Sequence, residues 1–199
     1  MNTLERIRAV LNAEAEAILA VNVTSTYEDA VNAILLCGGK VITTGIGKAG
    51  HIAHKFTATL CSTGTPSVFL HAAEAAHGDL GIVSENDVLV AFSTSGKSRE
   101  VIEILELARH LGVTHVIGVT SHPDSELRNH CEFILDMGSP QEACPLELTP
   151  TSTIAVMLAI SDALAIAVME RKEFTKDQWG LRHHGGYLGR AARIDNEPK

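Results

Sequence analysis

The sequence has no cluster of lysines and arginines: 16 basic residues stand against 24 acidic ones, for a formal net charge of −8. Nucleic acid backbones are held by clustered basic side chains, so this composition argues against a nucleic-acid-binding role. The four cysteines, Cys37, Cys61, Cys131 and Cys144, include no CxxC pair. No secretory hydrophobic segment follows Met1, and we therefore expect a cytoplasmic protein with reduced thiols.

Long apolar runs are also scarce. The longest, over residues 153–169, is interrupted by Ser161 and Asp162 and falls short of the roughly 18 residues that suggest a membrane span. We predict a buried helix there and no membrane partner. With 199 residues, 45% of them apolar, the chain is long enough to bury about 70% of its unfolded surface in one domain spanning 1–199.

Short β-branched runs alternate with helical patterns along most of the chain. Helical spacing predicts helices over 4–21 and 27–36, the second ending at Gly38 and Gly39. The patterns that follow predict strands over 40–44, 67–70, 88–92, 115–119 and 133–135, with helices over 48–61, 98–111, 125–129, 151–171 and 176–181. Strands that are apolar on both faces indicate a parallel sheet covered by helices. The expected fold is a three-layer, doubly wound α/β domain with five parallel strands, of the flavodoxin-like type.

In such a fold, ligands bind beyond the carboxyl ends of the strands. The loops expected there are 45–50, 71–81, 93–98, 120–124 and 138–150. The first contains "GIGKAG", in which Gly45, Gly47 and Gly50 match the dinucleotide pattern GxGxxG. That pattern expects an acidic residue at the end of the next strand, where His71 stands instead. Lys48 would also meet an approaching pyrophosphate, and the glycines are equally compatible with a tight turn alone.

The segment "AFSTSGKS" resembles a P-loop but has Ala91 where the motif GxxxxGK[ST] requires glycine. What remains is a helix start rich in hydroxyls, from Ser93, Thr94, Ser95 and Ser98. Unpaired N–H groups and the helix dipole favour a single phosphate group at such a place. The alternative is that Ser95 only caps the helix, but four hydroxyls in six residues exceed what a cap needs.

Six segments together carry a resemblance that is more specific than either glycine motif. They are "GIGKAGH", "STGTP", "HAAEAAHGDLG", "STSGKSRE", "EACPLELTPTST" and "HHGGYLGR", between about residues 40 and 190. In order and spacing they resemble the SIS (sugar isomerase) domain of D-arabinose-5-phosphate isomerases. The resemblance implies interconversion of D-ribulose 5-phosphate and D-arabinose 5-phosphate, feeding 3-deoxy-D-manno-octulosonate synthesis for lipopolysaccharide or capsule. Many members carry a CBS domain pair after this domain, and we expect this chain to be a short form without it. The resemblance also implies a homotetramer.

The resemblance implies a catalytic set of Lys48, Glu100, Glu142 and His183. Lys48 is expected to stabilise enediolate charge or to bind substrate oxygens, although a lysine at a helix start is usually only solvated. Desolvation is expected to raise the pKa of Glu142, so that Glu142 and His183 are both candidates for proton transfer at carbon. A plain surface glutamate is the competing interpretation of Glu142. Glu100 is either catalytic or a partner of the helix dipole.

Further substrate contacts are expected from Gly64, Thr65, His71 and His77, besides the hydroxyls of the phosphate loop. No cofactor is expected, and His71 is the candidate ligand for an inhibitory Zn²⁺. Two positions depart from the family pattern. Lys97 stands where relatives carry an acidic residue, and it would add positive charge beside the phosphate. His184 stands where they carry proline, which leaves the working histidine open between positions 183 and 184.

Two other functions remain open at this point. One is a different phosphosugar isomerase on the same domain, and the other is a phosphosugar sensor without catalytic activity. No helix-turn-helix segment or basic patch supports the sensor. The tail that carries His183 follows the last strand by some forty residues, so we expect it to complete a site across an interface of a homo-oligomer. The first helix, with its apolar stripe, is another expected interface element.

Overall fold

In the computed structural model, which describes residues 1–183, five parallel strands form one sheet. The strands are β1 (Val41–Gly45), β2 (Ser67–His71), β3 (Val88–Phe92), β4 (His115–Thr120) and β5 (Phe133–Asp136). Their order across the sheet is β2-β1-β3-β4-β5, and each neighbouring pair is parallel. The predicted five-stranded, doubly wound sheet is confirmed.

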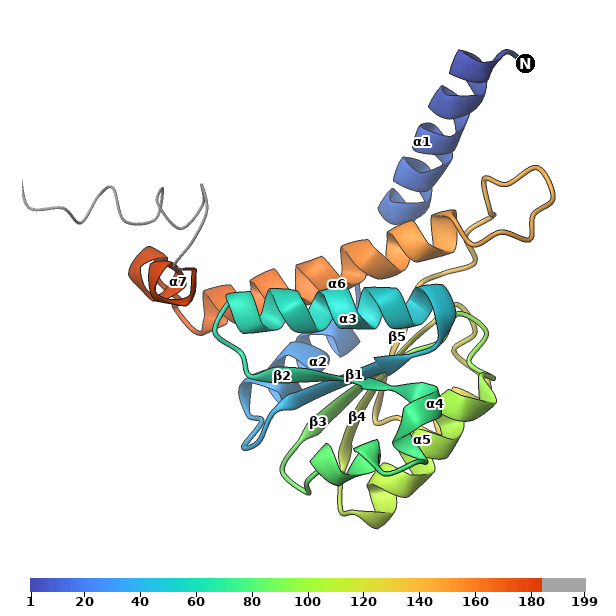
Figure 1. The fold of residues 1–199 in the computed structure, drawn as a ribbon. Coiled ribbons are helices and arrows are strands. Elements are labelled where there is room, and N and C mark those ends of the chain that lie inside the picture. The colour runs from blue at the N-terminus through green and yellow to red at the C-terminus, as the bar shows by residue number, and fades with distance from the viewer. Residues whose placement is uncertain (184–199) are drawn as a thin grey trace, which may run out of the picture.

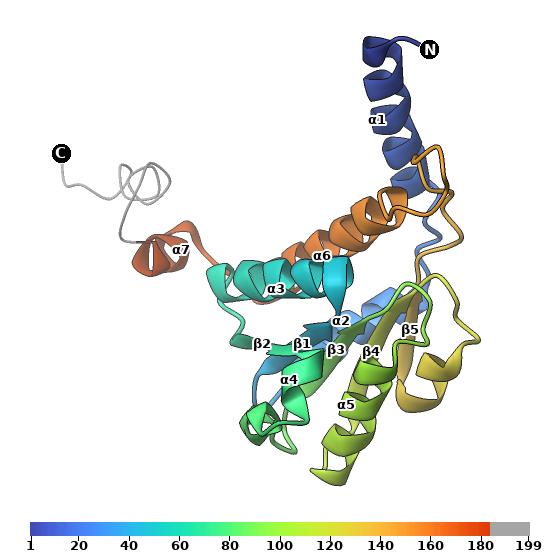
Figure 2. The same cartoon turned by 45° about the vertical axis from the view of Figure 1, so that its right-hand side comes forward.

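Helices cover both faces of the sheet (Figure 1). One face carries α2 (Ser25–Leu35), α3 (Gly47–Ser62) and α6 (Ser152–Arg171), and the other carries α4 (Ala72–Ala75) and α5 (Arg99–His110). The short α7 (Lys176–Arg182) follows the carboxyl end of α6. The first helix, α1 (Thr3–Leu19), contacts α6 and projects away from the sheet, and none of its residues is buried (Figure 2).

Two predicted boundaries need correction. The segment 71–81, expected as a polar loop, contains α4 and a 3-10 turn over Asp79–Ile82. The ring nitrogen Nδ1 of His71 accepts a hydrogen bond from the N–H of Ala73 and so caps α4. A helix of four residues is too short to show helical periodicity in the sequence, so α4 could not be predicted from the pattern. The short helix expected over 125–129 is a 3-10 helix over Glu126–His130.

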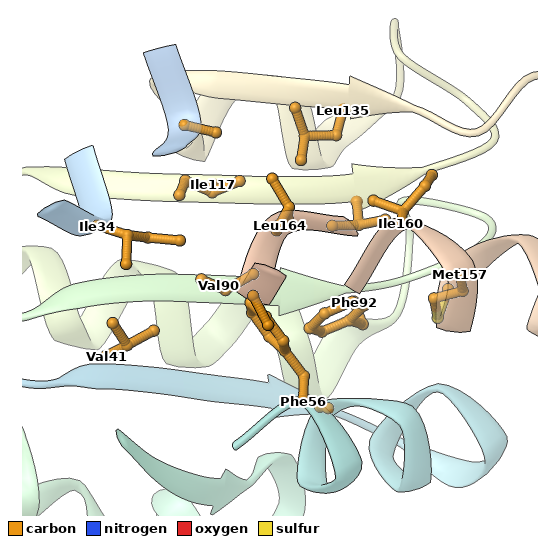
Figure 3. Packing of buried hydrophobic residues seen from close by; sticks show 14 of the residues in the cluster. Ile34, Val41, Phe56, Val90, Phe92, Ile117, Leu135, Met157, Ile160 and Leu164 are labelled. Atoms are coloured by element: carbon orange, nitrogen blue, oxygen red, sulfur yellow. The ribbon is translucent and has the colours of Figure 1, made fainter. Parts of the chain in front are cut away.

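Successive strand residues point into two separate cores, which is why the strands are apolar on both faces. The larger core packs Val90 and Phe92 of β3 against Phe56 of α3 and Leu164 of α6 (Figure 3). The rings of Phe56 and Phe92 meet edge to face at 5.9 Å between centroids. The smaller core lies on the other face of the sheet, where Leu89 of β3 packs against α4 and α5.

The helix α6 is the predicted buried helix, but it is longer than the apolar run suggested. The helix has 20 residues, and an 18-residue window of it has a mean hydropathy of 2.0, which makes it the one helix among residues 1–183 long and apolar enough to cross a membrane. The expectation that this segment is too short to cross a membrane is therefore wrong. The prediction of burial is confirmed, because half of this window is buried and the helix packs against α1, α2 and α3.

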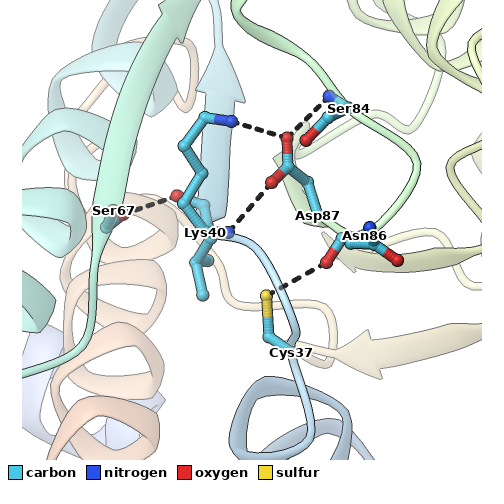
Figure 4. A network of polar contacts seen from close by, with 7 residues as sticks. Cys37, Lys40, Ser67, Ser84, Asn86 and Asp87 are labelled. Carbon is cyan, nitrogen blue, oxygen red and sulfur yellow. Dashed lines mark hydrogen bonds and ion pairs between the residues drawn. The ribbon is translucent and has the colours of Figure 1, made fainter.

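An ion pair joins β1 to β3 at their amino ends, opposite the expected ligand edge (Figure 4). The carboxylate of Asp87, whose side chain is fully buried, accepts hydrogen bonds from the Nζ of Lys40 at 2.8 Å and from its N–H at 2.9 Å. It also accepts one from the N–H of Ser84 at 2.8 Å. Burial raises the pKa of Asp87, but the hydrogen bonds from Lys40 and Ser84 together outweigh it and hold the pKa below its ordinary value.

We expect Asp87→Asn to lower the free energy of unfolding by about 2–3 kcal/mol at pH 7, because it leaves Lys40 beside an uncharged group. The folded-state pKa lies below that of the unfolded chain, so this contribution is present above about pH 4 and is lost as the pH falls. Urea unfolding of both proteins at pH 7 and pH 3.5 measures the difference. The exposed Asp29→Asn is the control, and equal losses at both pH values would contradict the assignment.

Candidate active site

The chain turns to opposite sides of the sheet after β1 and β3, which are neighbours with Gly45 in register with Phe92. From β1 it enters α3 on one face, and from β3 it enters α5 on the other. The loops that diverge there leave a crevice at the carboxyl edge, where doubly wound folds bind ligands. The crevice is a pocket of about 320 Å³, lined by Ile46, Lys48, Ala49, Ser93, Thr94, Ser95, Ser98, His122, Pro150 and Ile154.

The three glycines of "GIGKAG" bring α3 close to β1. A Cβ on Gly50 would lie 2.8 Å from the carbonyl oxygen of Gly45, and a Cβ on Gly45 would lie 3.1 Å from the carbonyl oxygen of Phe92. Gly47 has φ +59°, a conformation that favours glycine. The tight-turn interpretation therefore accounts for the glycines, and the turn places Lys48 on the first turn of α3 in the pocket wall.

The loop between β3 and α5 presents the predicted hydroxyls to the same pocket. The hydroxyls of Ser93 and Ser98 are hydrogen-bonded at 3.0 Å. Ser98 is the residue at the N-cap position of α5, and its side chain makes no capping hydrogen bond. Ser95 instead accepts from the N–H of Lys97 at 3.2 Å, so the idea that Ser95 only caps the helix is wrong. Gly96 has φ +61°, and a side chain there would collide with Ser125.

This arrangement suits an anion. The first turn of α5 offers N–H groups without a side-chain cap, the helix dipole is positive there, and Lys48 adds a full positive charge across the pocket. The pocket is small compared with the space that a dinucleotide would fill. Lys97 is exposed on the loop, and Glu100 is exposed on the first turn of α5, and neither lines the pocket.

Glu142 lies beside the pocket, at the start of α6. Its carboxylate accepts hydrogen bonds from the N–H and hydroxyl of Thr151, at 2.6 and 3.0 Å, and from the N–H and hydroxyl of Thr153. Burial raises the pKa of Glu142, but these hydrogen bonds together outweigh it, and the pKa is below its ordinary value. The expected raised pKa is therefore wrong. Glu142 caps α6 from the preceding loop, since Thr151 makes no cap of its own.

His183 is far from the pocket of its own chain. It follows α7 at the carboxyl end of α6, whereas Ile154, near the amino end of α6, lines the pocket. A helix of 20 residues is about 30 Å long, and α7 lies beyond its far end (Figures 1 and 2). The ring of His183 stacks on Trp179 with centroids 3.6 Å apart. The adjacent His184 lies outside the described residues.

Gly64 and Thr65 also lie away from the pocket, at the opposite edge of the sheet, where α3 ends and the chain turns toward β2. The Nζ of Lys172 donates to the Gly64 carbonyl and to the Thr65 hydroxyl, both at 3.1 Å. Gly64 has φ +82°, and the Phe174 ring occupies the place that a side chain would fill. Within one chain, the segment "STGTP" therefore contacts the connection between α6 and α7 and does not contact the pocket.

His71, the last residue of β2, and His77 flank α4 at the carboxyl edge of the sheet, and both are exposed. His71 is in register with Gly45, one strand away from the first pocket loop, but it does not line the pocket. No group of three or more potential metal ligands occurs within residues 1–183. The Zn²⁺ suggested for His71 therefore has no set of protein ligands around it in this part of the chain.

Sequence reasoning missed five residues of the pocket wall: Ile46, Ala49, His122, Pro150 and Ile154. Four of them are apolar or proline and carry no chemical signal. His122 falls in the loop 120–124, which was expected at a strand end, but it belongs to no motif that would single it out.

The fold and the pocket define a doubly wound α/β domain with a crevice at its switch point that is lined by hydroxyls and by Lys48. The SIS domain family matches residues 34–167. The chain belongs to the SIS domain family.

Its relatives agree with the resemblance seen in the motifs. Arabinose 5-phosphate isomerase KdsD of Pseudomonas aeruginosa is 48% identical over 158 residues, which are 79% of this chain and 48% of that protein. The chain spans about half the length of the curated relatives it matches. An Escherichia coli CFT073 protein solved in complex with arabinose 5-phosphate is 36% identical, with a TM-score of 0.88 over 92% of this chain and 100% of that one. A Bacteroides fragilis structure is 46% identical, with a TM-score of 0.90 over 94% and 100%.

We expect Glu142→Gln to lower the free energy of unfolding by about 1 kcal/mol at pH 7, because a neutral amide caps α6 less well. The folded-state pKa is lowered, so the difference is present above about pH 4 and disappears as the pH falls below it. Thermal unfolding between pH 3.5 and 7 measures it, with the exposed Glu103→Gln as control. An unchanged melting temperature at pH 7 would refute the capping role.

Proposed function

We propose that the protein is an aldose–ketose isomerase that interconverts D-ribulose 5-phosphate and D-arabinose 5-phosphate through a cis-enediol. The observation that carries this proposal is the pocket, where Lys48 faces a helix start with four hydroxyls. The relative in complex with arabinose 5-phosphate and the curated relatives support this choice of sugar phosphate. We place the activity in the cytoplasm, in 3-deoxy-D-manno-octulosonate synthesis for lipopolysaccharide or capsule.

The pocket offers groups for both ends of the substrate, its phosphate and its carbonyl. The phosphate group is held by the hydroxyls of Ser93, Thr94, Ser95 and Ser98 and by the N–H groups of α5. At the other end of the substrate, a base removes a proton from C1 of the ketose, and the electron pair forms the enediolate. The proton then returns at C2, a second proton moves from O1 to O2, and O1 becomes the aldehyde oxygen. The Lys48 ammonium stabilises the oxygen on which negative charge develops.

The lowered pKa of Glu142 bears on the choice of base. A carboxylate that accepts several hydrogen bonds is ionised at neutral pH but is a weaker base than an ordinary glutamate. This favours the capping role of Glu142 and leaves proton transfer at carbon to His183. A backbone carbonyl only accepts, so the contact of His183 Nδ1 with the Trp179 carbonyl at 2.9 Å places the hydrogen on Nδ1 and the lone pair of the neutral ring on Nε2.

The helix α6, about 30 Å long, separates His183 from the pocket of its own chain. We therefore propose that His183 serves the pocket of a second copy. Apolar surface for such an assembly is present. Leu4, Ile7 and Leu11 on α1 are each more than half exposed. A mostly apolar groove of about 650 Å³ runs between α1, α2 and α6. Exposed apolar surface of this kind marks a protein interface, and we propose a homotetramer of paired dimers.

Incubation with D-ribulose 5-phosphate in heavy water tests the reaction. We expect deuterium at C2 of the arabinose 5-phosphate formed, seen by NMR, because the proton that returns to C2 exchanges with solvent.

Lys48→Met should lower kcat/KM by about 10²–10³-fold, the usual cost of removing one donor to a developing oxyanion. Lys55 is an exposed lysine further along α3, and the control variant Lys55→Met should leave kcat/KM near the wild-type value. Binding without turnover in the wild-type protein would favour the phosphosugar sensor.

Mixing two inactive variants tests whether His183 acts on a second copy. Lys48→Met and His183→Ala are each expected to be nearly inactive. Dissociation and reassociation of the mixture should restore up to about a quarter of wild-type activity, because half of random pairs are hybrids with one intact site of two. Each variant carried through the same procedure alone is the control. No recovery, with hybrids shown by native mass spectrometry, would place His183 and Lys48 of one chain in the same site.

A further inference from the structure

His122 lies in the loop after β4 and reaches across to the loop after β3. Its Nδ1 is 3.0 Å from the carbonyl oxygen of Thr94, and its own N–H donates to the hydroxyl of Thr120 at 3.1 Å. The imidazole is exposed and lines the pocket together with the hydroxyl loop. The histidine of the loop after β4 is therefore fixed relative to the hydroxyls that follow β3.

The Thr94 carbonyl decides which nitrogen of His122 carries the hydrogen of the neutral ring. This carbonyl also accepts from the N–H of Ser121 and from the hydroxyl of Thr120, both at 3.1 Å. A carbonyl oxygen only accepts, so Nδ1 of His122 carries its hydrogen. The second nitrogen, Nε2, holds the lone pair of the neutral ring and a second N–H in the protonated ring.

Few other charges surround this ring. Lys48 is the other ionisable residue that lines the pocket. Lys97 is exposed on the facing loop, and Asp124 is exposed on the same loop as His122. The carboxylate of Glu142, beyond Pro150, is engaged by Thr151 and Thr153. Among residues 1–183, Nε2 makes no hydrogen bond with the protein.

We propose that His122 is a further anion-binding residue of this pocket, whose Nε2–H binds the phosphate group of the substrate. This inference rests on the geometry of the ring. Nδ1 is hydrogen-bonded to the loop whose hydroxyls are proposed to hold the anion, and Nε2 remains available to bind the same anion. The inference rests on the proposed function and deepens it. It makes His122 a binding residue for the phosphate, separate from the groups that transfer protons.

A pH dependence of binding follows. Imidazole gains its second proton between about pH 8 and pH 5, and a charged donor binds an anion more strongly than a neutral one. Lysine ammonium groups ordinarily titrate near pH 10, well above this range. The anion should therefore bind more tightly at the lower pH, and the gain should depend on Nε2.

Sulfate is the appropriate probe, because its charge does not change over this range, whereas a phosphate monoester itself titrates near pH 6. Calorimetric titration of the wild-type protein with sulfate should give a dissociation constant about five- to tenfold lower at pH 6 than at pH 8. His122→Asn keeps an N–H close to the Nδ1 position, for the Thr94 carbonyl, but removes Nε2. In this variant the two dissociation constants should agree within about twofold.

Three further variants separate binding from loop structure and from other histidines. His122→Gln places an uncharged N–H near the Nε2 position, and it should bind sulfate better than His122→Asn but with no gain at pH 6. His110→Asn removes an exposed histidine at the far end of α5 and should keep the wild-type pH dependence. His54→Asn removes another exposed histidine, on α3 and outside the pocket, and should keep it too.

The outcomes distinguish the role of His122 from the proposed function. A wild-type pH dependence retained in His122→Asn overturns the role of His122, whether or not the protein isomerises sugar phosphates. Sulfate binding that depends on His122, in a protein that does not convert D-ribulose 5-phosphate, upholds this inference and contradicts the proposed function. A wild-type protein that binds neither sulfate nor inorganic phosphate, with arabinose 5-phosphate also unbound, overturns both.

Discussion

The close approach of α3 to β1 is the constraint on which the site depends. Gly45 and Gly50 lie so near each other that a side chain on either would contact backbone, and Gly45 also lies against the Phe92 carbonyl of the neighbouring strand. This contact sets where α3 begins, and therefore where Lys48 stands relative to the loop after β3. The parallel pairing of β1 with β3 then sends α3 and α5 to opposite faces. An open crevice between two helix starts is the consequence.

The remaining elements hold this crevice in place from both edges of the sheet. Glu142 caps α6, so the start of that helix supplies Pro150 and Ile154 as the apolar wall opposite the hydroxyls. At the other edge of the sheet, the buried pair of Asp87 and Lys40 ties the amino ends of β1 and β3 together. The same two strands are thus joined at their amino ends by an ion pair, and the loops that follow their carboxyl ends diverge around the pocket.

Much of the fold could be predicted because it depends on local pattern. Strands that are apolar on both faces and a helix after each of β1, β3 and β5 leave few arrangements other than a covered parallel sheet. The position of the hydroxyl-rich loop after β3 could be predicted for a similar reason, since its residues are contiguous. The pKa of Glu142 could not, because it depends on Thr151 and Thr153 folding back onto the carboxylate. His122 could not, because its partner, the Thr94 carbonyl, lies 28 positions earlier in the chain.

The sequence by itself determined the sheet, the glycine turn, the hydroxyl-rich helix start and membership of a family whose motifs run through the whole domain. Only the tertiary structure decided which of the candidate residues meet. Lys48 and the hydroxyl loop share one pocket, whereas His183 and Gly64 lie elsewhere on the same chain. The reason is physical: periodicity records which face of an element is buried, but a site is made by contacts between elements. The length of α6 sets the distance between the pocket and the tail, and within one chain that distance keeps them apart.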